Sequence, residues 1–253
     1  MYITGKSNIG KVLKINEDAL IIKDLAPLNH TGESDYVIMI VADGNGSHPG
    51  GISSGALVAN IVLDYIRRTM KLHSSINDLK EIINTALFTA SRTMVALNGL
   101  NEEYKALYAS ITISVISKAS KEVYVASVGN TETYLLRKGR LTRMIDLHTE
   151  AFAMMDKGEV KEEEYYTHPK HNVLTSAIGV FGEYQISSFS GKLFPEDVLF
   201  IMSDAVPNHI TLGEMLNILS SETNLDLALD KVIDLINERG GYDNITLSFA
   251  VID

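Results

Sequence analysis

Hydrophobic residues along this chain gather in short segments that are rich in Val, Ile and Tyr and that end in turn-forming residues. The pattern is typical of β-strands, because β-branched and aromatic side chains fit a pleated sheet while Gly, Asn and Asp favour turns. The sequence predicts strands over residues 19–23, 36–42, 110–117, 123–127, 133–136, 198–202 and 244–251.

Two pairs of segments carry their hydrophobic residues at steps of three and four instead. Residues 52–69 and 79–97 predict two amphipathic helices in succession, and residues 212–219 and 225–236 predict a second pair that ends at Gly240-Gly241. Strands therefore come in runs that are separated by helices in runs. That order favours an α+β layered fold with mainly antiparallel sheets over a Rossmann-type α/β sheet.

The chain shows no internal repeat, no low-complexity linker and no shift in composition, so we expect one domain over residues 1–253. Residues 145–176 differ from the rest because they lack a clean period. They also carry an acidic run formed by Glu159, Glu162, Glu163 and Glu164. We expect this segment to be a solvent-facing insertion of short helices.

Composition excludes several classes of protein. The chain has 22 Lys and Arg against 32 Asp and Glu, a net charge of −10, and no cysteine. The lack of cysteine excludes a disulfide-stapled module, a cysteine-nucleophile hydrolase, a thiolate zinc site and an iron–sulfur protein. The acidic charge repels phosphodiester backbones and the chain has no cluster of Lys and Arg, so we expect no nucleic-acid partner.

The sequence also predicts a protein without a membrane segment. Charged residues interrupt residues 1–25, which argues against a signal peptide. The longest uninterrupted apolar stretch, residues 37–42, is far shorter than the roughly 20 residues that span a bilayer. We expect a soluble, cytoplasmic protein.

Acidic residues stand at the ends of predicted strands. Two very apolar strands run directly into Asp43 and Asp204, and two others begin directly after Glu17-Asp18 and Asp243. In an antiparallel pair the end of one strand lies beside the start of its neighbour, so we expect these acids to meet at one rim. Carboxylates without a cationic partner repel one another and tend to hold a cation. Oxygen ligands without Cys or His select Mg²⁺, Mn²⁺ or Ca²⁺, and the pattern predicts such a site.

Each of these acids taken singly has a structural alternative, because Asp-Gly is a common turn signal and acids are frequent at strand ends. Two known motifs also fail in the loop 43–51. His48 replaces the Gly at the sixth position of an EF-hand loop, and Pro49 replaces a Gly of the dinucleotide fingerprint. His48 is a candidate proton donor to a leaving oxygen, with an ordinary loop histidine as the alternative. His168 and His171 have no third ligand nearby and are interpreted as surface loop residues.

Five motifs occur in the order found in metal-dependent protein phosphatases of type 2C. They are Asn16-Glu17-Asp18, Val41-Ala42-Asp43-Gly44-Asn45-Gly46, Val125-Ala126-Ser127-Val128-Gly129-Asn130, Ser203-Asp204 and Gly240-Gly241-Tyr242-Asp243-Asn244-Ile245-Thr246. The chain resembles the compact bacterial branch of that family over practically its whole length. Residues 158–179 resemble the flap of that branch and the strand that follows it.

The resemblance implies a four-layer αββα sandwich, in which two mainly antiparallel sheets are flanked by helix pairs, with two Mn²⁺ or Mg²⁺ ions at one edge. The metal ligands that it implies are Glu17, Asp18, Asp43, Gly44, Asp204 and Asp243. By matching motif positions, Asp43 bridges the two ions, the Gly44 carbonyl binds one, and Asp204 and Asp243 complete the other. The remaining two acids bind directly or through water.

The chain also departs from the family pattern. Leu13 stands where the family has an Arg that docks the substrate phosphate, and Lys11 or Lys14 are possible substitutes. Asn130 replaces the Asp that helps to bind a third ion, so we expect a third ion to bind weakly or not at all. Asn45 takes the place of a Met or His, so the family assigns no general acid here. Ala205 in place of the usual Gly is a milder change. His48 is a further candidate for contact with the substrate phosphate.

The function that follows is Mn²⁺- or Mg²⁺-dependent hydrolysis of phosphoserine and phosphothreonine in proteins, with Asp43, Asp204 and Asp243 as catalytic residues. The expected partners are phosphoproteins and an opposing Ser/Thr kinase. The alternative, which Leu13 and Asn130 suggest, is a weakly active or inactive relative that binds a phosphoprotein or a regulatory partner.

Overall fold

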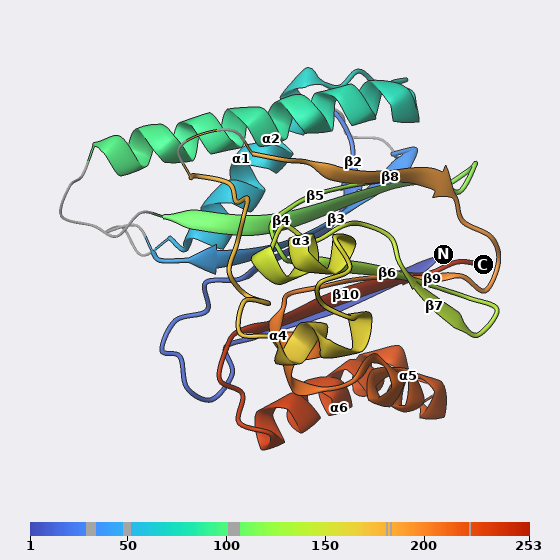
Figure 1. The fold of residues 1–253 in the computed structure, drawn as a ribbon. Coiled ribbons are helices and arrows are strands. Elements are labelled where there is room, and N and C mark those ends of the chain that lie inside the picture. The colour runs from blue at the N-terminus through green and yellow to red at the C-terminus, as the bar shows by residue number, and fades with distance from the viewer. Residues whose placement is uncertain (29–33, 48–51, 101–106, 181, 183, 223) are drawn as a thin grey trace.

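The computed structural model describes residues 1–253 apart from 29–33, 48–51, 101–106, 181, 183 and 223. Its strands form two five-stranded sheets, and all the strand pairs described are antiparallel. Helices cover the outer face of each sheet, so the layers follow the order helix, sheet, sheet, helix (Figure 1). The predicted four-layer α+β sandwich is confirmed.

The first sheet has the strand order β2-β3-β4-β5-β8, and the second has the order β1-β10-β9-β6-β7. The strands of the first sheet are β2 (Ala19–Leu25), β3 (Tyr36–Asn45), β4 (Tyr108–Ser117), β5 (Glu122–Val128) and β8 (Ser187–Lys192). Those of the second sheet are β1 (Tyr2–Asn8), β6 (Glu132–Arg137), β7 (Arg140–Arg143), β9 (Val198–Met202) and β10 (Ile245–Val251). The chain crosses from the first sheet to the second between β5 and β6 and again between β8 and β9.

The helices pair as the sequence predicts. The pair on the first sheet is α1 (Ser54–Thr69) and α2 (Ile76–Gly99), and the pair on the second sheet is α5 (Leu212–Ser221) and α6 (Leu225–Glu238). The first helix begins later than predicted because Ser53 has an extended backbone and caps it, accepting a hydrogen bond from the Ala56 N–H at 3.2 Å. Ser75 and Asp78 form a capping box that moves the start of α2 ahead of the predicted residue 79.

Three apolar cores separate the four layers. Ile38 and Ile40 of β3 pack with α1 and α2, whereas Met39 and Val41 of the same strand lie in the core between the two sheets. The third core joins Phe200 of β9 and other residues of the second sheet to α5 and α6. Alternate residues of β3 therefore serve two cores, which is why the strand is apolar without interruption.

The structure confirms each predicted strand and helix and adds elements that the pattern did not predict. The additions are β1, β7, β8 and the short helix α4 (Ala205–His209), while the helix α3 (Glu150–Asp156) and the 3-10 helix η1 (Glu162–Thr167) are the short helices expected within residues 145–176. β8 has the sequence SSFSGK, which contains one large apolar residue and has little intrinsic preference for a strand. Its place in the sheet depends on pairing with β5. β1 carries Gly5, whose lack of a side chain allows close contact with Ser248 of β10.

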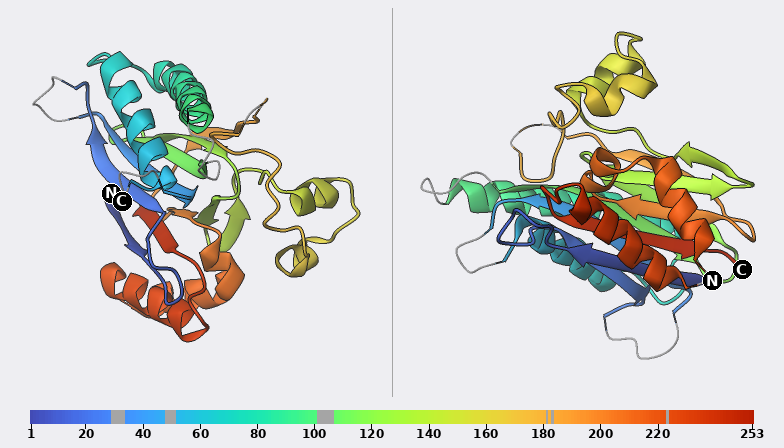
Figure 2. Two further views of the ribbon diagram at one scale, coloured as in Figure 1. Left: turned by 90° about the vertical axis from the view of Figure 1, so that its left-hand side faces the viewer. Right: turned by 90° about the horizontal axis from the view of Figure 1, so that it is seen from below.

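The segment 145–176 contains α3 and η1 and projects from the sandwich (Figure 2). Buried polar contacts attach it to the second sheet. The Tyr166 hydroxyl of η1 donates to Glu132 of β6 at 2.8 Å, and Tyr134 donates to the same carboxylate at 2.6 Å. Arg143 of β7 lies 3.6 Å from Glu132 and packs over the Tyr165 ring. These contacts hold η1 against β6 and β7. The segment consists of short helices, as expected.

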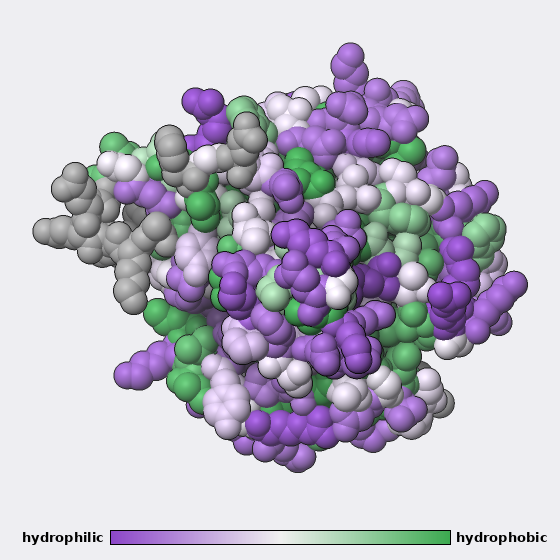
Figure 3. All heavy atoms as spheres, in the orientation of Figure 1, coloured by the Kyte–Doolittle hydropathy of each residue, from purple (hydrophilic) through white to green (hydrophobic). Residues whose placement is uncertain are grey.

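Hydrophilic side chains cover much of the outer surface of this segment (Figure 3). Glu162, Glu163 and Glu164 are all exposed, in agreement with the acidic run of the sequence. Among the helices described, none combines the length and the apolar character that a membrane crossing requires.

Candidate active site

Strand pairing in the first sheet brings two of the predicted acids together. Ala19 of β2 lies opposite Ala42 of β3, so Asp18 and Asp43 follow directly at the same end of the sheet. The Asp18 side chain is buried beneath this end, at 8% relative exposure. Asp43 in turn lies opposite Ser110 of β4.

Strand pairing in the second sheet does the same for the other two acids. Met202 of β9 lies opposite Leu247 of β10, and the ladder continues where the Ser203 N–H donates to the Thr246 carbonyl at 2.8 Å. Asp204 and Asp243 lie just beyond this pair. The strand ends that carry the four acids lie at the left-hand end of the sandwich in Figure 1, which faces the viewer in the left view of Figure 2.

Asn244 joins the two halves of this end. Its side-chain oxygen accepts a hydrogen bond from the Glu17 N–H at 2.8 Å, and its amide group donates to the carbonyls of Ile9 and Ile15. Its own N–H donates to Asp243 Oδ1 at 2.7 Å. Asn244 is 3% exposed and thus ties the start of β2 to the start of β10. The sequence placed it in a motif but gave no signal of this role.

A cavity of about 340 Å³ lies at the place where the strand ends meet. Its lining residues are Leu13, Glu17, Asp43, Gly44, Asn45, Tyr108, Ser110, Asn130, Asn172, Leu174, Asp204, Asp243 and Asn244. Both sheets and the segment 145–176 contribute to it. The acidic strand ends therefore meet around one cavity, as predicted. Asp18 is buried and does not belong to the lining.

Burial and mutual repulsion raise the pKa values of these carboxyl groups. Burial raises the pKa of Asp18 to about 7 and that of Asp204 to about 6, and neighbouring acids add to both shifts. The pKa of Asp43 lies well above its usual range because the group is buried beside Asp204, Asp18 and Asp243. The pKa of Asp243 is raised as well, chiefly by burial. The site favours any partner that supplies positive charge.

The donor set of the cavity fits a hard divalent cation. It offers carboxylates and the Gly44 carbonyl, and no Lys or Arg belongs to the described lining. The Asp18 Oδ2 atom is buried and has no hydrogen-bond partner among the described residues, so its charge needs compensation. Within the same residues, no three acidic or histidine side chains converge closely enough to enclose one ion. The carboxylates surround the cavity instead, as repulsion between like charges favours.

Glu17 and Gly44 shape the loop that follows β3. The two Glu17 carboxylate oxygens accept hydrogen bonds from the Gly46 N–H and the Ser47 hydroxyl, each at 2.9 Å. A side chain at Gly44 would collide with the backbone of Gly55 and Glu17, so only glycine fits there. Glu17 thus holds the loop in place while its side chain borders the cavity.

The two lysines predicted to contact phosphate do not belong to the described lining of the cavity. Lys11 and Lys14 are exposed and do not belong to its lining, and the Lys11 N–H is bound to the Gly241 carbonyl at 2.8 Å. Leu13 does line the cavity. His48 lies outside the described residues. The prediction that Lys11 or Lys14 replaces the family Arg is therefore not supported by their position.

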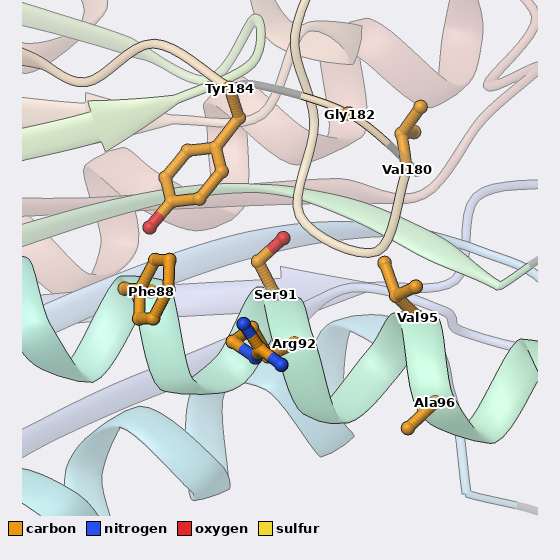
Figure 4. Close-up of a pocket in the computed structure, with 8 residues that line it drawn as sticks. All are labelled: Phe88, Ser91, Arg92, Val95, Ala96, Val180, Gly182 and Tyr184. Atoms are coloured by element: carbon orange, nitrogen blue, oxygen red, sulfur yellow. The ribbon is translucent and has the colours of Figure 1, made fainter.

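A second cavity of about 390 Å³ lies between α2 and the residues Val180, Gly182 and Tyr184. Phe88, Ser91 and Arg92 of α2 face Val180 and Tyr184 across it (Figure 4). Its described lining is largely apolar and contains no carboxylate. It therefore offers no carboxylate ligands for a metal ion, whereas the cavity at the strand ends brings Asp43, Asp204 and Asp243 together and is the candidate active site.

Comparison with known proteins agrees with this geometry. The sequence profile of the family described as Stage II sporulation protein E (SpoIIE) matches residues 33–250. The serine/threonine phosphatase stp of Listeria monocytogenes is 28% identical over 253 residues, which cover 98% of this chain and 94% of that protein.

Solved structures share the fold. The serine/threonine phosphatase of S. agalactiae superposes with a TM-score of 0.84 at 22% identity, over 100% of this chain and 99% of that one. The catalytic domain of the serine threonine protein phosphatase PstP, in complex with 2 manganese ions, gives a TM-score of 0.73 at 20% identity, over 100% and 98% of the two chains. Since the family profile spans most of the sequence, the chain belongs to the SpoIIE family and is a bacterial member of the metal-dependent protein phosphatases of type 2C.

Proposed function

We propose that this protein hydrolyses phosphoserine and phosphothreonine in other proteins, using two Mn²⁺ or Mg²⁺ ions. The observation that carries the proposal is the cavity at which Asp43, Asp204 and Asp243 come together from both sheets. A phosphatase active site must hold divalent cations beside an opening for a phosphate, and this cavity has the donors and the access. The phosphatase relatives support the same assignment.

In this proposal Asp43 holds both ions, the Gly44 carbonyl holds one, and Asp204 and Asp243 hold the other. Glu17 and Asp18 act directly or through water. When bound, the ions supply Lewis acidity toward water and positive charge toward the phosphoryl oxygens. The other lining residues limit and orient the phosphate: Leu13 and Leu174 form an apolar part of the wall, while Tyr108 and Asn172 carry neutral donor groups.

Phosphoproteins are the proposed substrates, and a Ser/Thr kinase that places the phosphate is the proposed opposing partner. We infer that the protein acts in the cytoplasm, because protein kinases and the ATP that they use are found there. Both statements rest on the chemistry of the proposed reaction.

The test measures release of phosphate from a phosphothreonine peptide and from p-nitrophenyl phosphate with and without Mn²⁺. We expect turnover that depends on Mn²⁺ and that falls by at least about 100-fold in Asp43→Asn and Asp204→Asn, since each change removes a ligand charge. Glu163→Gln, which removes one exposed charge on η1, is the matched control and should keep full activity. The proposal would be contradicted by turnover that is the same with and without Mn²⁺, or by turnover that neither aspartate substitution lowers.

A second function deserves a test because the described lining of the cavity has no Lys or Arg to bind a phosphate. A weakly active relative would bind a phosphoprotein or a regulatory partner without efficient hydrolysis. Calorimetry with the phosphothreonine peptide distinguishes the two functions. Tight binding with negligible release of phosphate supports the second function, and rapid release removes it.

A further inference from the structure

Asn130 lies at the crossover where the chain passes from the first sheet to the second. The preceding Gly129 has a φ of 107°, and a side chain there would collide with Ser110. The Gly129 N–H donates to His148 Nδ1 at 3.0 Å, and the Gly129 carbonyl accepts from the His148 N–H at 2.9 Å. Gly129 is therefore packed against β4 and held by two hydrogen bonds to His148. The Asn130 side chain that follows is 6% exposed, and the fixed backbone determines where it lies.

Each polar atom of the Asn130 side chain has a partner. Ser110 Oγ accepts from the Asn130 N–H at 3.2 Å and donates to Asn130 Oδ1 at 2.7 Å. Asn130 Nδ2 donates to Asp204 Oδ2 at 2.9 Å. The orientation of the amide follows from these contacts, because a carboxylate only accepts hydrogen bonds and must face the NH₂ group. A charged aspartate at this position could not donate to Asp204.

The contacts form a chain across the site. Ser110 lies opposite Asp43 in the first sheet, and Asp204 follows β9 in the second sheet. Ser110, Asn130 and Asp204 therefore connect β4, the neighbour of the strand that carries Asp43, to the end of β9. A hydrogen bond to a carboxylate is stronger than one between neutral groups, so this chain fixes the direction of Asp204.

We propose that Asn130 is a positioning residue, which uses a neutral hydrogen-bond donor to hold Asp204 where the family uses a carboxylate and a further cation. The inference rests on the proposed two-ion function. It predicts that the protein binds two ions and no third one, and that Asp204 is ready to bind an ion before any ion arrives. Loss of such an outer contact to a metal ligand lowers metal affinity by roughly 10- to 100-fold.

The experiment measures Mn²⁺ binding and unfolding separately. Calorimetry and elemental analysis give the dissociation constant and the number of bound ions, and thermal unfolding in EDTA gives the stability of the metal-free protein. The variants are Asn130→Ala, which removes the donor, and Asn130→Asp, which replaces it with a carboxylate. Ser127→Ala is the matched control, because Ser127 lies in the adjoining strand and accepts a buried hydrogen bond from Thr112 at 2.9 Å without touching Asp204.

We expect the wild type to bind two Mn²⁺ ions, and Asn130→Ala to bind them roughly 10- to 100-fold more weakly. Ser127→Ala should lower the unfolding temperature but keep the wild-type affinity. Asn130→Asp should unfold at a lower temperature than the wild type in EDTA at pH 7.5, and at millimolar Mn²⁺ it should bind a third ion. Wild-type affinity in Asn130→Ala, equal loss of affinity in Ser127→Ala, or three ions in the wild type would each overturn the inference.

The outcomes distinguish a failure of this inference from a failure of the proposed function. If the wild type binds two ions and Asn130→Ala weakens them, but no phosphopeptide is hydrolysed, the role of Asn130 holds and the phosphatase proposal fails. If the peptide is hydrolysed and Asn130→Ala binds Mn²⁺ as the wild type does, the reverse is true.

Discussion

At the scale of single residues, Leu13 places an apolar side chain in a cavity wall that is otherwise mostly polar. It lines the cavity with an alkyl side chain and is 40% exposed, so a longer side chain has room to extend. We expect Leu13→Arg to lower the KM for a phosphothreonine peptide by about tenfold, because a guanidinium binds phosphate through two hydrogen bonds. Steady-state kinetics with Mn²⁺ measure the change, and kcat should move less than KM.

Val12→Arg is the matched control for this change. Val12 is also exposed but does not belong to the cavity lining. An arginine at this position therefore adds the same charge beside the cavity and not within its wall. An equal fall of KM in both variants would mean that general electrostatic attraction acts, and an unchanged KM in Leu13→Arg would mean that another group already binds the phosphate.

The sequence predicted which acids meet but not how they are held. Asp43 and Asp204 follow strongly apolar strands, and antiparallel pairing then determined where they lie. The contacts of Asn130 and Asn244 depend on partners more than 70 residues away in sequence, Asp204 and Glu17. No local pattern reports such contacts, so only the folded chain shows them.

At the scale of elements, the attachment of the segment 145–176 rests on a buried charge. The Glu132 side chain is 2% exposed, and burial raises its pKa although Arg143 and the hydroxyls of Tyr134 and Tyr166 counteract the shift. Arg143 also donates to the Tyr134 hydroxyl at 2.9 Å. The cluster joins β6 and β7 to η1, and the segment in turn brings Asn172 to the cavity wall.

We expect Arg143→Ala to lower the free energy of unfolding by about 3–5 kcal/mol, because it leaves the Glu132 carboxylate buried without its cation. Urea unfolding measures this loss, and limited proteolysis should show earlier cleavage within residues 150–170. Arg140→Ala, an exposed residue on the same strand, is the control and should change stability by no more than about 0.5 kcal/mol. Equal losses in the two variants would refute the role of the buried pair.

Elements with a strong apolar period could be predicted, and those held by their neighbours could not. β3 and α1 carry their own pattern, since β3 buries both of its faces and α1 buries one continuous face. β7 and β8 are polar edge strands that depend on pairing with β6 and β5. α4 has five residues and follows Asp204 directly, too short for a helical period to appear.

At the scale of the whole molecule, part of the net charge of −10 is concentrated where the two sheets meet. The folded protein raises the pKa of Asp18 to about 7 and that of Asp204 to about 6, whereas both groups ionise near pH 4 in an unfolded chain. Between those values the folded state binds more protons than the unfolded state. Without divalent ions, the stability that these two groups contribute is therefore fully present below about pH 4 and is lost as the pH rises through about 7.

We expect the unfolding temperature in EDTA to fall by roughly 5–10 °C between pH 5 and pH 8, since 1 kcal/mol corresponds to about 2–4 °C for a chain of this size. Saturating Mn²⁺ should reverse the trend, because metal ligands must lose their protons and ion binding strengthens as the pH rises. Scanning calorimetry at four pH values, with EDTA and with Mn²⁺, checks both slopes. A metal-free protein that gains stability over this range would contradict the raised pKa values.

The core between the two sheets has a consequence for how the proposed centre behaves. Asp43 belongs to one sheet, and Asp204 and Asp243 adjoin the strands of the other. The sheets touch through an apolar layer, and hydrogen bonds of Asn130 and Asn244 join them at the end that carries these acids. Ions held by both sets of acids act as a cross-link between two plates. Sliding of one sheet over the other and release of an ion become a single coupled equilibrium, in which each favours the other by the same factor.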